Sequence, residues 1–223
     1  MGDGIINING SNVETLQILL LTTLITLLPS IIVMMTSFTR YIVVFSFLRS
    51  AMGTQQTPPN MVLVGLALFL TLLTMAPVIS QIQTDAYEPY INEEITQEEF
   101  VERASVPLKD FMIRNTETGT LVMFCDLAQV DPPEEITVET AEPLPMTVIV
   151  PAFMTCELKR AFEIGFLLYI PFMLIDIVVS STLMSMGMIM LPPSMISMPF
   201  KLLLFISLNG WELLFSTLVQ GFN

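Results

Sequence analysis

Four methionines recur at every second position of residues 184–190, in a short stretch between two long hydrophobic segments. In extended backbone, alternate side chains point to the same side, whereas on a helix they scatter around the axis. Gly187 permits unusual backbone angles, and Pro192 and Pro193 cannot continue a helix. The pattern favours a loop at a hairpin turn that presents soft thioethers in one direction. Ordinary methionines that face lipid or the core are the alternative. The run comprises Met184, Met186, Met188 and Met190.

Several charged residues lie within or beside hydrophobic segments, where charges usually pair or face water, and Arg40, Arg49, Asp176 and Lys201 are candidates for contacts between subunits or at loops. If the turn lies near Met190, Asp176 is about 21 Å from it and Lys201 only about 3 Å. Straight antiparallel helices would hold these two groups apart. We therefore expect a contact between subunits, or a Lys201 that caps the loop in water. Arg40 and Arg49 lie on an amphipathic stretch that leads into a polar connector ending in two prolines, and we expect their guanidinium groups to reach the membrane interface. A structural turn alone is the alternative.

The residues that usually perform catalysis are scarce. The chain contains no histidine, which removes the commonest general base and metal ligand. Cys125 and Cys156 are too few and too far apart for a zinc site, and they are either two packed thiols or a disulfide. No glycine-rich phosphate loop is present, and Asp176 has no second intramembrane aspartate beside it. The sequence predicts no enzyme, no metal and no cofactor.

The composition indicates a membrane-associated protein. Of 223 residues, 53% are hydrophobic and 13% are charged, and the mean hydropathy is +0.72. Internal prolines predict kinked helices that associate closely, and Ala161 and Gly165, one helical turn apart, let two backbones approach. We expect an all-α membrane-associated protein of kinked helical hairpins in a ring-like oligomer. The segments long enough to span about 30 Å of hydrocarbon are 15–39, 61–83, 162–190 and 199–219.

The negative charge is concentrated in one segment. Fifteen acidic and only three basic residues lie between positions 85 and 142, so this part carries −12 of the total of −13. Such a segment faces water and does not bind nucleic acid. Thr96 and Glu99 have the spacing of a capping box that opens a helix. The chain thus divides into an N-terminal hairpin (12–83), an acidic water-facing insertion (84–150) and a C-terminal hairpin (151–219). The placement of lysine and arginine puts the insertion on the outer side.

Several longer motifs resemble the FliP family of flagellar export-gate proteins. The resemblance runs from about residue 12 to 218, and the order of the motifs makes it specific. The run RxxxGTQQTPP points to the flagellar branch and not to the injectisome relatives. The motifs are TSFTR (36–40), LRSAMGTQQTPPN (48–60), GLALFL (65–70), PAFMTCEL (151–158), AFxIGF (161–166), IPFMLID (170–176), MIMLPP (188–193), MPFK (198–201) and GW (210–211).

The resemblance implies a subunit of the type III export gate in the flagellar basal body, at the bacterial cytoplasmic membrane. In that family, five copies assemble into a helical, conical pore. They join the gate proteins FliQ and FliR and the larger FlhA and FlhB, and they pass unfolded flagellar subunits. The family's hairpins form this assembly without spanning the bilayer as ordinary transmembrane helices, so the resemblance argues against four ordinary spans. A methionine-rich loop seals the pore, which here corresponds to Met186, Met188 and Met190. An injectisome gate subunit and a small-solute channel are the alternatives.

Overall fold

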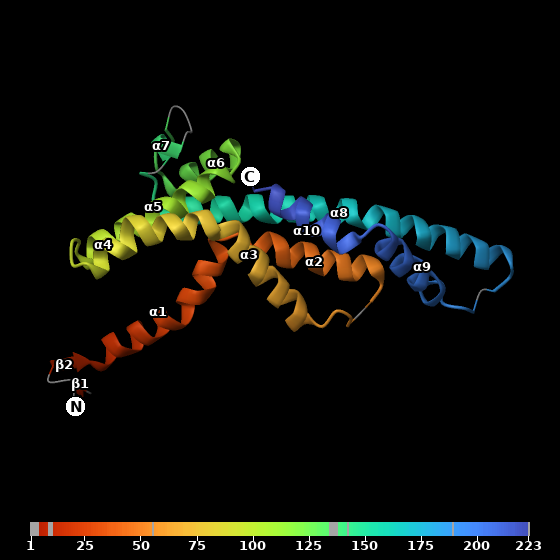
Figure 1. Ribbon diagram of the computed structural model, residues 1–223, viewed down its shortest axis with the longest axis horizontal. Coiled ribbons are helices and arrows are strands. Elements are labelled where there is room, and N and C mark those ends of the chain that lie inside the picture. Colours follow the sequence, from red (N-terminus) through yellow and green to blue (C-terminus); the bar gives the residue numbers. More distant parts are fainter. Residues whose placement is uncertain are drawn as a thin grey trace.

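The computed structural model describes residues 5–8, 11–54, 56–133, 138–141, 143–188 and 190–222. The molecule is elongated and almost entirely helical, as expected for an all-α fold (Figure 1). Its axis is α8 (Met146–Ser185), whose 40 residues extend over about 60 Å at the rise of an α-helix. A short antiparallel hairpin, β1 (Ile5–Ile8) and β2 (Ser11–Glu14), precedes the helices.

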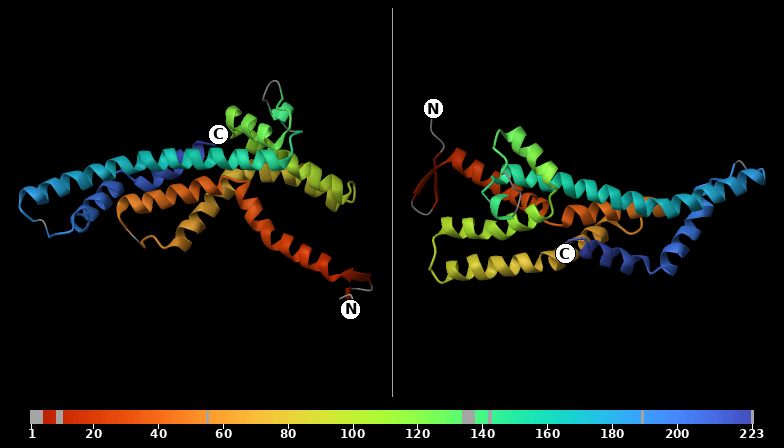
Figure 2. Two further views of the ribbon diagram at one scale, coloured as in Figure 1. Left: turned by 180° about the vertical axis from the view of Figure 1, so that it is seen from behind. Right: turned by 90° about the horizontal axis from the view of Figure 1, so that it is seen from above.

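The remaining elements pack along α8 or project from it. The first helix, α1, projects away from the body and carries the β-hairpin at its far end (Figure 1, Figure 2). In chain order the helices are α1 (Thr15–Met34), α2 (Phe38–Met52), α3 (Asn60–Ile82), the π-helical turn η1 (Gln83–Tyr87), α4 (Glu88–Ile91), α5 (Gln97–Arg114), α6 (Thr118–Ala128), α7 (Val138–Ala141), α8, α9 (Pro193–Ser207) and α10 (Gly210–Gln220).

Two of the four expected spanning segments differ from the structure. Within the described residues, two continuous helices are long and apolar enough to cross a membrane, Asn60–Ile91 and Met146–Ser185. The expected segment 15–39 is divided, because α1 ends at Met34 and α2 starts at Phe38. The expected segment 199–219 is also divided, because α9 and α10 meet at a bend of 62° and can form only a broken span.

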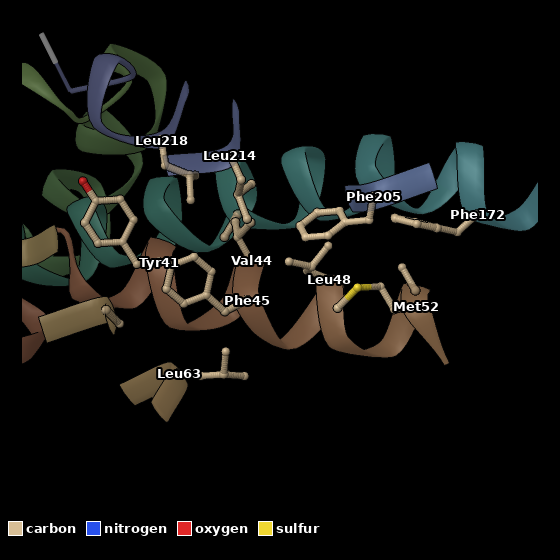
Figure 3. Packing of buried hydrophobic residues seen from close by; sticks show 13 residues of the cluster. Tyr41, Val44, Phe45, Leu48, Met52, Leu63, Phe172, Phe205, Leu214 and Leu218 are labelled. Carbon is tan, nitrogen blue, oxygen red and sulfur yellow. The ribbon is translucent and has the colours of Figure 1, made fainter. Parts of the chain in front are cut away.

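A hydrophobic core joins the two hairpins around α2. One face of this helix is fully buried against α8, α10 and the start of α3 (Figure 3). The aromatic rings of Phe45 and Phe215 meet edge to face, with 5.7 Å between centroids. Burial of this face explains why α2 lies along the long helix although its sequence also contains arginines and serines. The buried members include Tyr41, Val44, Phe45, Leu48, Leu63, Phe172, Phe205, Leu214 and Leu218.

The acidic insertion folds back onto the first half of α8. Helices α5 and α6 bury a second core there, which includes Met112, Leu121, Val148 and Phe153. The predicted capping box at the start of α5 is confirmed: the Thr96 N–H donates to Glu99 Oε2 at 2.8 Å, and the Glu99 N–H donates to Thr96 Oγ1 at 3.3 Å. Donation from the Thr96 backbone and hydroxyl lowers the pKa of the Glu99 carboxyl.

Candidate functional site

The hairpin between α8 and α9 forms one end of the molecule, and the methionine run lies at its tip (Figure 1). Helix α8 ends in a Schellman motif: the Gly187 N–H donates to the Met184 carbonyl, and the Met188 N–H donates to the Leu183 carbonyl, both at 3.0 Å. Gly187 has φ = +75°, which side chains with a Cβ rarely adopt. The helix terminates here because glycine permits this left-handed turn.

The methionines at the tip are exposed. The exposed fraction is 67% for Met186, 43% for Met188 and 97% for Met190. Met184 lies in the last turn of α8 and Met186 has helical backbone angles, so the extended loop begins only at Gly187, later than the alternating pattern suggested. Pro192 and Pro193 then start α9, at its N-cap and first position. Ile189 lies outside the described residues. The tip thus presents several unbranched, polarizable side chains to its surroundings.

An ion pair joins the two arms of the hairpin within one chain. Lys201 Nζ lies 2.7 Å from Asp176 Oδ2, and Ser197 donates a hydrogen bond to Asp176 Oδ1 at 2.6 Å. Lys201 also donates to the Ala51 carbonyl at 3.0 Å, which ties the hairpin to the end of α2. The lysine is 5% exposed, whereas the Asp176 side chain is 40% exposed.

Our expectation that Asp176 and Lys201 lie far apart was wrong, because it placed the turn incorrectly. Asp176 lies nine residues before the end of α8, or about 14 Å along the axis. Helix α9 begins at Pro193 and not near residue 199, so Lys201 lies eight residues, or about 12 Å, into it. The two side chains are therefore level. The lysine binds within its own chain and does not cap the loop in water.

Arg40 does not reach the interface as expected but lies in a buried network. Its Nε donates to Glu157 Oε2 at 2.8 Å, and its Nη1 donates to the Gly221 carbonyl at 3.0 Å. The guanidinium carbon also lies 3.5 Å from the centroid of the Phe222 ring. The side chains of Arg40 and Glu157 are 2% and 0% exposed. This network ties α2, α8 and the residues after α10 together.

Sequence reasoning did not find Glu157 as the partner of Arg40. The signal was a single glutamate in the apolar stretch PAFMTCEL, since such a carboxylate requires a cation when buried. Arg49, in contrast, is half-buried and meets no carboxylate within ion-pair distance in the part of the chain that the structure describes.

The small residues of the 161–165 pair lie where α8 meets α2. Ala161 is fully buried in the core. A Cβ added to Gly165 would lie 2.5 Å from Phe47 Cγ, closer than atoms tolerate. Glycine at this position therefore allows α2 and α8 to approach each other.

Cys156 makes a contact that links α8 to the acidic insertion. Its Sγ accepts a hydrogen bond from the Glu117 N–H, at the first residue before α6, over 3.3 Å. Lys159, one turn further on, donates to both carboxylate oxygens of Glu117 at 2.9 Å and thereby lowers the pKa of that carboxyl. Cys125 and Cys156 are both free and buried, so they form no disulfide.

The described residues contain no group of three or more histidine, cysteine, aspartate or glutamate side chains that could hold a metal ion. The geometry therefore offers a set of apolar, adaptable side chains at a hairpin tip, two ion-pair networks that brace the hairpins, and long apolar helix surfaces.

The comparisons with known proteins agree with the motifs. The sequence profile of the FliP family matches residues 20–218. The chain is 49% identical to the flagellar biosynthetic protein FliP of Aquifex aeolicus, over 96% of this chain and 88% of that protein. It is 48% identical to FliP of Pectobacterium carotovorum (96% and 82% covered) and 47% identical to FliP of Bacillus subtilis (94% and 92% covered). With a match along almost its whole length, this chain belongs to the FliP family.

Proposed function

We propose that this chain is a pore-forming subunit of the flagellar type III export gate and passes unfolded flagellar subunits across the cytoplasmic membrane. As a FliP family member it is a component of the flagellar export apparatus. The observation that carries the proposal of a pore is the exposed methionine tip at the end of the α8–α9 hairpin. In a ring of copies these tips meet at the axis and form a constriction.

The uncovered apolar surface of the helices supports assembly with other chains. Only 11% of the residues are buried in the most hydrophobic stretch of α8. In the corresponding stretch of the continuous helix Asn60–Ile91, 28% of the residues are buried. Exposed apolar surface of this extent is stable only against lipid or other protein subunits. The family context supplies the partners in our proposal: further copies of this chain, about five in all, with FliQ, FliR, FlhA and FlhB. The acidic insertion lies on the outer side.

The methionine tips act as a gasket. A methionine side chain is unbranched and has three rotatable bonds, so it conforms to cargo of changing shape. When no cargo is present, the apolar side chains close together and exclude water and ions. The Asp176–Lys201 ion pair and the contact of Lys201 with α2 hold the two arms of the hairpin in register, so that each copy presents its tip in the same way.

Replacing Met186, Met188 and Met190 together by Ala tests this function. The variant should assemble but conduct ions when the complex is reconstituted in vesicles, because alanine cannot fill the constriction. A matched control replaces three exposed methionines elsewhere, Met61, Met123 and Met173, which should leave the membrane tight. An assembled tip variant that stays ion-tight contradicts the gasket. A leak of equal size from the control variant contradicts its location at the tip.

A further inference from the structure

A hollow of about 650 Å³ lies between the end of α2 and the start of α9. One wall is the last turn of α2 and the turn after it, with Arg49, Ser50 and Thr54. The other wall is the first turns of α9, with Met195 and Met198. The hollow thus has a polar side with one cation and an apolar side with two methionines.

Arg49 has no counter-ion among the residues that the structure describes. Of the other basic residues on the apolar helices, Arg40 and Arg160 meet Glu157, and Lys201 meets Asp176. No described carboxylate lies within ion-pair distance of Arg49, which is half-buried. The five N–H donors of its guanidinium group therefore remain available for an anion.

The backbone carbonyl groups at the end of α2 that accept hydrogen bonds do so from other donors than the Arg49 guanidinium group. Lys201 already donates to the Ala51 carbonyl, and the Gly53 N–H donates to the Ser50 carbonyl. The hydroxyl of Thr54 donates to the Arg49 carbonyl at 3.4 Å. The oxygen atoms of an anion bound in the hollow would thus accept hydrogen bonds mainly from Arg49. The exposed Ser194 lies on the opposite wall.

The charge of the surroundings permits an anion. Outside residues 85–142 the chain carries six acidic and five basic residues, so the part of the chain that holds the hollow is nearly neutral. Met195, on the wall of the hollow, is 69% exposed, and further along α9 Leu203 is 65% exposed. A free phosphate ion would not bury this apolar surface, whereas the acyl chains of a lipid would cover it.

We infer that this hollow binds the headgroup of an anionic phospholipid, with the phosphate on Arg49 and the acyl chains along α9. The bond is a charge-assisted hydrogen bond from a planar fork of donors to phosphate oxygens. The inference does not depend on the pore, because it concerns a surface at the side of the hairpin. A bound lipid would fix the depth at which α2 and α9 sit in the membrane.

Native mass spectrometry of the full chain in detergent tests the site, with palmitoyl-oleoyl-phosphatidylglycerol, palmitoyl-oleoyl-phosphatidylcholine and inorganic phosphate as probes. We expect the wild type to retain the anionic lipid about fivefold better than the zwitterionic one. Arg49→Gln should lose this preference, Arg49→Lys should keep most of it, and Arg103→Gln, a matched change in the acidic insertion, should keep all of it. Millimolar phosphate should not displace the lipid.

A second variant guards against a folding defect at Arg49. Ser194→Glu leaves Arg49 in place and adds a carboxylate to the opposite wall of the hollow, so it should abolish retention of the anionic lipid. Undiminished retention by Arg49→Gln overturns the inference. Displacement of the lipid by phosphate shows a site for the free anion instead. Fewer copies per complex in Arg49→Gln with unchanged lipid retention shows that a carboxylate of a neighbouring copy is the counter-ion, which also overturns it.

Discussion

Glu157→Gln should be among the most destabilising single changes in this protein. Glu157 accepts two hydrogen bonds from the buried Arg40 guanidinium. The amide of the variant can accept only one of these two bonds and carries no charge, so among the described residues Arg40 keeps that neutral acceptor, the Gly221 carbonyl and the face of the Phe222 ring. A guanidinium cation that is 2% exposed would then lack a neutralising charge.

The expected size follows from this geometry. Removing one partner of a fully buried ion pair costs about 3–5 kcal/mol, because the other charge remains desolvated. For a chain of this length, 1 kcal/mol lowers Tm by about 2–4 °C, so the loss amounts to roughly 6–20 °C. Replacing both Arg40 and Glu157 by Met should recover most of the loss, since a buried ion pair contributes little net stability over an apolar pair of similar volume.

The fluorescence of Trp211 provides the assay. It is the only tryptophan of the chain, and it packs against Phe205 at 5.2 Å between ring centroids, in the same core as α2. Thermal unfolding in detergent should show a large loss for Glu157→Gln. The control Glu163→Gln, at an exposed position of the same helix, should change stability by less than about 0.5 kcal/mol. The reasoning is refuted if Glu157→Gln melts at the same temperature as the wild type. It is also refuted if the double Met variant is as unstable as Glu157→Gln.

Three further changes probe other parts of the fold. Gly165→Ala should cost about 1–3 kcal/mol by forcing α2 and α8 apart. Gly65→Ala, at a helical position with open space, should instead stabilise by about 0.5–1 kcal/mol; equal melting temperatures would sink the packing argument. Lys201→Met should cost about 1.5–3 kcal/mol and speed amide exchange in α9; unchanged exchange there would contradict its bracing role. Donation from Thr96 lowers the pKa of Glu99, so its ionised form stabilises α5 above the ordinary glutamate pKa and loses this effect as pH falls through the lowered value. Glu99→Gln should therefore weaken protection of the first turn of α5 at neutral pH but not at a pH below the lowered pKa of Glu99, and a difference that persists there would argue against the capping box as its cause.

Local patterns in the sequence were sufficient for the features that depend on neighbouring residues. The helix that starts at the Thr96–Glu99 box and the turn at Gly187 both follow from backbone chemistry within a few residues. The all-α fold and the membership of the FliP family were also predictable, because hydrophobic periodicity and motif order extend along the whole chain. The exposure of the methionine tip was also predictable, because it depends only on the local turn.

Features that depend on tertiary packing were not predictable in this way. The partner of Arg40 lies 117 positions away in the sequence, so hydropathy alone could not distinguish a buried ion pair from an arginine at the interface. The contact of Asp176 with Lys201 depends on the residue at which α9 begins, and an error of six residues moves a side chain by about 9 Å. The 62° bend between α9 and α10 occurs in a stretch whose hydropathy is continuous.

The central claim is that copies of this chain form a ring and bring their methionine tips together. Native mass spectrometry of the detergent-extracted complex, expressed with and without FliQ and FliR, tests it most directly. The account predicts a complex of about five copies of this chain, the number expected from the family, that takes up both partners when they are present. A monomer or dimer under both conditions would contradict the account and leave Met186, Met188 and Met190 as side chains that face lipid.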